Sequence, residues 1–135
     1  MVKIGRPFFA MLITMSTVVL GNATSKRTLV EFWHTGDDGL SQKLADQVER
    51  ALARSPDFSV SAGRKSGTLI VTIPTNVEWK QIGKRTQVLY HVEFSSVDSD
   101  MQSQTKGSCW EDRLSDCANQ IVKATRIAAQ KLPVH

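Results

Sequence analysis

The stretch LADQVERALARSPDFSV, residues 44–60, marks the point at which a helix gives way to a strand. Its apolar residues recur at intervals of three and four, and the pattern extends back to Leu40, which predicts an amphipathic helix from Leu40 to Arg54. Ser55-Pro56-Asp57 ends that helix, because proline is excluded from helix interiors. Apolar and polar residues then alternate from Phe58 to Ala62, which predicts a short, half-buried strand.

The flanking sequence predicts further strands and a second helix. Thr28–His34 and the β-branched run Thr68–Ile73 are expected to be strands, the second of them central in a sheet and ended by Pro74. Thr86–Ser96 alternates most clearly, with four apolar residues on one face: Val88, Tyr90, Val92 and Phe94. Met101–Ser108 alternates weakly and predicts an edge strand, whereas residues 75–85 are interpreted as a polar connection. A second amphipathic helix is expected from Glu111 or Asp112 to Pro133.

The resulting order, β-α-β-β-β-β-α, predicts an α+β fold. We expect a two-layer sandwich in which two amphipathic helices cover a mixed sheet of four to five strands. Ahead of the first predicted helix, Asp37 and Asp38 lie between glycines. They are interpreted as a helix cap rather than a cation site, because the additional oxygen ligands of a calcium loop are missing from the sequence.

Residues 1–23 have the pattern of a secretory signal peptide, which leaves residues 24–135 as a single predicted domain. Lys3 and Arg6 precede an uncharged run from Phe8 to Leu20, which is shorter than the roughly 20 residues that span a bilayer. We therefore expect a periplasmic or secreted protein without a stable membrane anchor after cleavage. The net charge of +4 would fall by the two cations of the signal, so a nucleic-acid partner is not expected.

Both cysteines, Cys109 and Cys117, lie in the predicted exported part, where an even pair favours a disulfide. Eight residues on one helix would separate them by about 12 Å, too far for a bridge. Cys109 is therefore expected to precede the helix that contains Cys117. The three histidines are scattered and no metal-binding spacing occurs, so no metal or cofactor is predicted.

The element order, together with residues 44–60, resembles the small α/β modules of bacterial envelope proteins. Examples are the N-terminal module of the periplasmic Tol-system propeller protein, the lipoprotein activators of penicillin-binding proteins, and the curli-export lipoprotein. This resemblance implies a periplasmic role in protein–protein contacts and implies no catalytic residues. The present chain differs in having no lipid-attachment cysteine near the predicted cleavage site and in having the Cys109–Cys117 pair.

A set of aromatic and basic residues supplies the candidate binding residues if they are exposed, since Trp and Arg are common interface anchors. They are Trp79, Lys80, Lys84, Arg85, Trp33 and His91. The prediction is a non-enzymatic envelope-assembly factor, or an inhibitor or immunity-type binder, whose partner is another envelope or secreted protein. Alternatively, each Trp packs beneath a loop.

Two other functions remain open. One is a small cell-wall-active hydrolase, or a glycan- or ligand-binding protein, with a pocket near Trp79, His91 and Glu93. The other is a dimer that pairs through the edge strand Met101–Ser108. That edge would either offer its backbone groups to a partner strand or be protected by its polar side chains.

Overall fold

The computed structural model describes residues 27–61, 63 and 65–134. The predicted signal peptide, residues 1–23, lies outside the described residues, as does Ala62 at the end of one predicted strand. No helix in the described ranges combines the length and the apolar character needed to cross a membrane.

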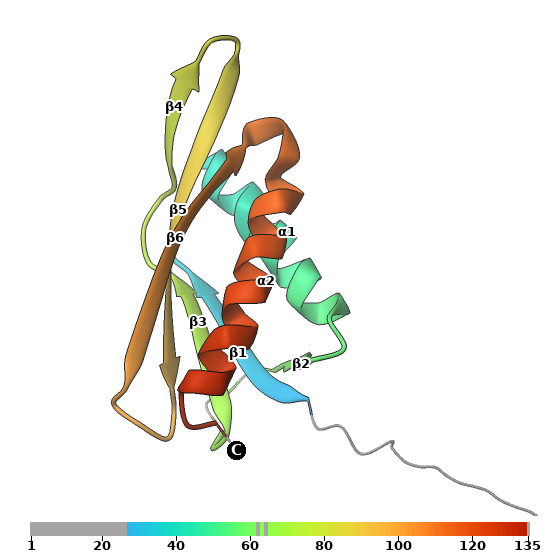
Figure 1. The fold of residues 1–135 in the computed structure, drawn as a ribbon, viewed down its shortest axis with the longest axis vertical. Coiled ribbons are helices and arrows are strands. Elements are labelled where there is room, and N and C mark those ends of the chain that lie inside the picture. Colours follow the sequence, from blue (N-terminus) through green and yellow to red (C-terminus); the bar gives the residue numbers. More distant parts are fainter. Residues whose placement is uncertain (1–26, 62, 64, 135) are drawn as a thin grey trace, which may run out of the picture.

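Two helices cover one face of a six-stranded mixed sheet (Figure 1), so the predicted α+β class is confirmed. The helices pack against each other and against the sheet. The elements, in chain order, are β1 (Thr28–His34), α1 (Gly39–Arg54), β2 (Phe58–Val60), β3 (Thr68–Ile73), β4 (Glu78–Ile82), β5 (Arg85–Ser96), β6 (Gln102–Trp110), a single 3₁₀ turn (Glu111–Arg113) and α2 (Leu114–Lys131).

Strand β5 organises half of the sheet. Along one side its first half pairs with β4 and its second half with β3, while β6 pairs antiparallel with it along the other side. Beyond β3 lie β1 and then β2, both parallel to their neighbours. The sheet is therefore mixed, with its antiparallel part built around β5.

The strand count differs from the predicted four to five because the supposed polar connection, residues 75–85, contains β4. Every residue of β4 is exposed, so the segment has no buried face and no apolar period for the sequence to display. Its extended form comes from pairing with β5 across the two-residue loop Gly83-Lys84. Gly83 has a φ of 62°, a conformation that glycine adopts without strain.

The core lies between the helices and the sheet and is built mainly from aliphatic side chains of β1, β3, β5 and the two helices. Its fully buried members include Val30, Leu44, Val48, Leu52, Leu69, Val71, Val88, Val92 and Ile121. At the start of α1, Asp38 Oδ1 accepts a hydrogen bond from the Ser41 amide at 2.6 Å. The predicted cap is thereby confirmed, and Asp38 satisfies one of the helix's four unpaired N–H groups.

Candidate functional site

The hairpin of β4 and the first half of β5, residues 78–89, extends past the ends of both helices (Figure 1), and we call it the arm. At its base the arm is a three-stranded ribbon of β4, β5 and the last residues of β6. At its tip only β4 and β5 remain, joined by Gly83 and Lys84. This geometry presents the β4 side chains to solvent on a projecting element.

The base of the arm is fastened to the first turn of α1. Asn76 Oδ1 accepts from the Asp37 amide at 2.8 Å, and the Asn76 amide group donates back to the Asp37 carboxylate at 3.2 Å. The buried Val77 N–H donates to Ser41 Oγ at 2.9 Å. Three hydrogen bonds thus fix the direction in which the chain leaves β3 and enters β4.

Trp79 lies on the helix side of the arm. It pairs with Val88, which in turn pairs with Cys109, and residues directly opposite one another share a face of the sheet. Val88 is fully buried, yet 61% of Trp79 remains exposed at the outer rim of this row. The tryptophan therefore presents a large apolar surface to solvent.

The rest of the arm combines an apolar residue with two lysines. Lys80 and Ile82 alternate with Trp79 along β4 and so lie on the outer face of the sheet. Ile82 is 45% exposed, and Lys80 and Lys84 are exposed as well. Within the arm, Thr86 Oγ1 donates to Gln81 Oε1 at 2.9 Å, which links the two strands through their side chains.

Arg85 is engaged within the chain. Its guanidinium donates to Asp112 Oδ1 at 3.0 Å and lies over the Trp110 ring, 4.2 Å from the ring centre. These two contacts join the arm to the turn between β6 and α2. We therefore assign Arg85 to orienting the arm, whereas Trp79, Lys80 and Lys84 are the candidate residues that face solvent.

The cysteines form the predicted disulfide. Cys109, near the end of β6, is bonded to Cys117 in the first turn of α2, with a Cα–Cα distance of 5.5 Å. As expected, Cys109 precedes the helix. The disulfide lies at the base of the arm, on the side of β5 opposite β4. Cys109 is the neighbour of Val88 across the sheet, as Trp79 is on the other side.

Trp33 and His91 lie away from the arm's helix side. Trp33, 49% exposed, pairs with Thr72, and Thr72 pairs with Glu93, so this row lies on the outer face. His91 alternates with Val92 onto the same face, and its Nε2 is 2.7 Å from Gln104 Oε1. The predicted pocket of Trp79, His91 and Glu93 does not form, because Trp79 lies on the opposite face of the sheet from the other two.

His91 instead borders an open hollow of about 420 Å³ on the outer face, between the base of the arm and β6. Its lining is mostly polar and includes Asn76, Glu78, Gln104 and Lys106. The Asn76 side chain is hydrogen-bonded to Asp37, and the His91 side chain is hydrogen-bonded to Gln104. Within the described residues, no group of three or more His, Cys, Asp or Glu side chains is arranged to hold a metal ion.

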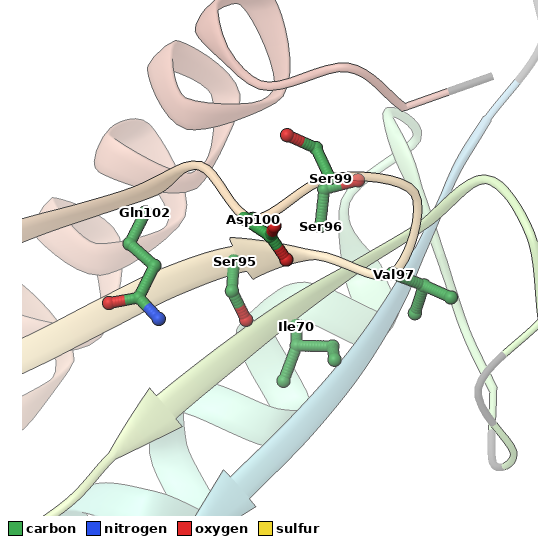
Figure 2. Close-up of a pocket in the computed structure, with 7 residues that line it drawn as sticks. All are labelled: Ile70, Ser95, Ser96, Val97, Ser99, Asp100 and Gln102. Carbon is green, nitrogen blue, oxygen red and sulfur yellow. The ribbon is translucent and has the colours of Figure 1, made fainter.

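A second hollow, of about 390 Å³, lies at the other end of β5, where Figure 2 shows Ser95, Asp100 and Gln102 around the turn into β6. Two of its serine hydroxyls maintain that turn. Ser96 Oγ accepts from the Asp98 amide at 3.1 Å, and Ser99 Oγ accepts from the Met101 amide at 3.0 Å. The Ser- and Asp-rich composition of residues 95–100 thus has a local structural role.

Comparisons with known proteins give no family model and no curated protein that matches this chain. Among solved structures, it is similar to a minor lipoprotein from Acinetobacter baumannii, at 12% identity and a TM-score of 0.45, over 78% of this chain and 97% of that one. It is also similar to the PelC dodecamer from Paraburkholderia phytofirmans, at 15% identity and a TM-score of 0.44, over 74% and 84% of the two chains.

A third likeness is to a hypothetical protein from Chlamydia trachomatis, at 8% identity and a TM-score of 0.38, over 63% of this chain and 73% of that one. The three envelope modules that the sequence resembles are not confirmed by these matches.

Proposed function

We propose that this chain is a non-enzymatic, exported protein of the bacterial envelope that acts through protein contacts, with the arm as its contact surface. The observation that carries the proposal is the 61% exposure of Trp79 on a strand whose residues are all exposed. Full burial of a large apolar side chain contributes about 1.5–3 kcal/mol, and the larger part of this contribution is still available to a partner at Trp79. Tryptophan is also enriched among the residues that dominate binding energy.

The arm suits this role because it is already oriented. Asn76 and Val77 are bonded to α1, and Arg85 is held by Asp112 and Trp110. A surface that is ordered before binding avoids part of the entropic cost of association. The partner is an envelope or secreted protein, which makes this chain an assembly factor or an inhibitor or immunity-type binder.

Export and a non-catalytic role are supported by the state of particular side chains. The Cys109–Cys117 bond suits an oxidising compartment, in agreement with the predicted signal peptide. Both cysteines are consumed in that bond, and the His91 imidazole is bonded to an amide, Gln104, rather than to a nucleophile.

The test is a crosslinking pull-down with the full chain from the envelope fraction of its host, read by mass spectrometry. Trp79→Ala and Lys84→Glu are the arm variants, and Trp33→Ala is the matched control because Trp33 is comparably exposed on the other face. We expect one stoichiometric protein that is lost with both arm variants and retained with the control.

Loss of that partner with Trp33→Ala alone would place the contact elsewhere on the sheet. Capture of no protein, together with hydrolysis of cell-wall material by the same preparation, would overturn the proposal.

A further inference from the structure

We infer that β6 binds an extended, acidic segment of a partner protein as an added strand, with apolar side chains of that segment seated beside α2. This surface is distinct from the arm, and the inference does not depend on the role of Trp79. In the ranges that the structure describes, β6 pairs with β5 and with no other strand, and its second edge is open from Gln102 to Lys106, ahead of the Ser108 carbonyl that Gln120 occupies.

The directions of the backbone groups follow from two hydrogen bonds. The Ser108 carbonyl accepts from the Gln120 side-chain amide at 3.0 Å, so it points away from β5. Backbone groups alternate in direction along an antiparallel strand, and the N–H and C=O of Gln104 and Lys106 therefore also point away from β5. On the other side of β5, the Val97 amide donates to the Thr68 carbonyl of β3, which agrees with this alternation.

A small apolar groove accompanies this edge on the helix side. It has a volume of about 140 Å³ and lies between β6 and α2, with Phe94 as its floor and Ala124, Ile127 and Ala128 along α2. Ile127 is 46% exposed although its neighbours Thr125 and Ala128 are buried. Side chains of an added strand alternate between faces, so every second residue of the segment would lie against this groove.

The charges around the edge favour an acidic occupant. Lys106 lies at the middle of β6 on the outer face, and Lys131 lines the groove, both of them exposed, whereas the exposed Glu93 of the outer face belongs to β5 and lies one strand farther from the edge. A partner segment with acidic residues between its apolar residues would complement both cations. A second copy of this chain fits less well, because antiparallel pairing at the middle of β6 would place the two Lys106 ammonium groups opposite each other.

The test is selection of a displayed library of random peptides, equal in length to β6, on the full chain. We expect the enriched peptides to alternate apolar with polar residues and to contain an excess of Asp and Glu. Hydrogen exchange should then slow at the Gln104 and Lys106 amides when an enriched peptide is added, since those groups become paired.

Three variants locate the binding. Lys106→Pro removes an N–H that points away from β5 and leaves the β5 ladder intact, and Ile127→Asp places a carboxylate in the apolar groove. Each should weaken binding of the enriched peptides by about tenfold or more. Lys106→Glu, which keeps the backbone donor, should weaken the acidic peptides alone. Trp79→Ala is the matched control and should leave binding unchanged, which separates this inference from the proposal for the arm.

Three outcomes would overturn the inference. The first is enrichment of no peptide, which is the behaviour of an edge protected by its own side chains. The second is enrichment of peptides that tolerate Lys106→Pro and Ile127→Asp. The third is a dimer in solution that Lys106→Pro dissociates, because β6 would then be occupied by a second copy.

Discussion

The Arg85 guanidinium lies 4.2 Å from the centre of the Trp110 ring and is bonded to Asp112 at 3.0 Å. These residues come from the first position of β5 and from the end of β6 and the turn that follows it. The contact therefore ties the outermost part of the sheet to the segment that leads into α2. A binding surface carried on a two-stranded tip depends on such a tie for a fixed orientation.

Replacing Arg85 by Ala should lower the free energy of unfolding by about 0.5–1 kcal/mol, because both of its contacts are partly exposed to solvent. Added salt should reduce this difference, since part of it is an ion pair. Urea denaturation at low and high salt measures both effects. Lys84→Ala is the matched control, and an equal loss in that variant would contradict the role given to Arg85.

Gly107→Ala should destabilise the fold by about 1–3 kcal/mol. The buried Tyr90 ring covers Gly107, and an added Cβ would overlap that ring and approach Gln120 Oε1 to 2.8 Å. Gly39→Ala is the control, because nothing lies within 4 Å of the added carbon and alanine is the better helix former. The midpoint temperature of thermal unfolding should fall for Gly107→Ala and rise for Gly39→Ala. An unchanged midpoint for Gly107→Ala would show that the Tyr90 ring moves aside at little cost.

Burial raises the pKa of the Tyr90 phenol above its ordinary value of 10.0. The folded protein therefore keeps the phenolic proton to a higher pH than the unfolded chain does. The resulting stabilisation is complete below the unfolded pKa and is lost as the pH rises through the folded pKa. Since the chain contains one tyrosine, tyrosinate absorbance reads this group directly.

The absorbance titration of the native protein should show a midpoint above that of the chain in denaturant. Tyr90→Phe should weaken the decline in stability above pH 10.0, while costing about 1 kcal/mol at neutral pH through the lost hydrogen bond to Gln120. Equal midpoints for the native and the denatured chain would contradict the burial argument.

Removing the disulfide with the double variant Cys109→Ala/Cys117→Ala should cost about 2–3 kcal/mol, the range expected for a short closed loop. Chemical reduction of the unmodified protein should produce a similar loss in a denaturant titration. A reducing agent that leaves the double variant unaffected is the control. Equal stability of the oxidised and reduced protein would show that α2 holds its place without the bond.

Elements with one buried face could be predicted from the sequence, because burial gives their apolar residues a regular spacing. The boundaries of β1 and β3 agree with the predicted strands, α1 begins one residue before the predicted Leu40, and α2 follows a 3₁₀ turn at the predicted Glu111. Strand β4 has no buried face, so its sequence shows no regular alternation of apolar and polar residues. The available signal was Gly83, the first residue of a two-residue loop directly before the strongly alternating β5.

The sequence indicated which residues to consider as the candidate site but not on which face of the sheet each of them lies. Trp79, Lys80 and Lys84 lie on one hairpin because they are close in sequence. The face on which each side chain lies depends on the register with β5, which sequence spacing alone does not specify. For the same reason, sequence spacing alone is compatible with a pocket shared by Trp79, His91 and Glu93, whereas the pairing of Trp79 with Val88 places Trp79 on the opposite face of the sheet.

The position of β1 has a consequence for the order in which the fold can form. Strand β1, the first strand of the described residues, is an interior strand, flanked by β2 on one side and β3 on the other. Its hydrogen-bonding groups therefore stay unmatched until both later segments are available, and the β3–β5 pairing must wait longer still. Such non-local pairing is slow and leaves strands exposed to aggregation, so a holdase chaperone that shields β1 until β3 and β5 are available should increase the yield of folded protein.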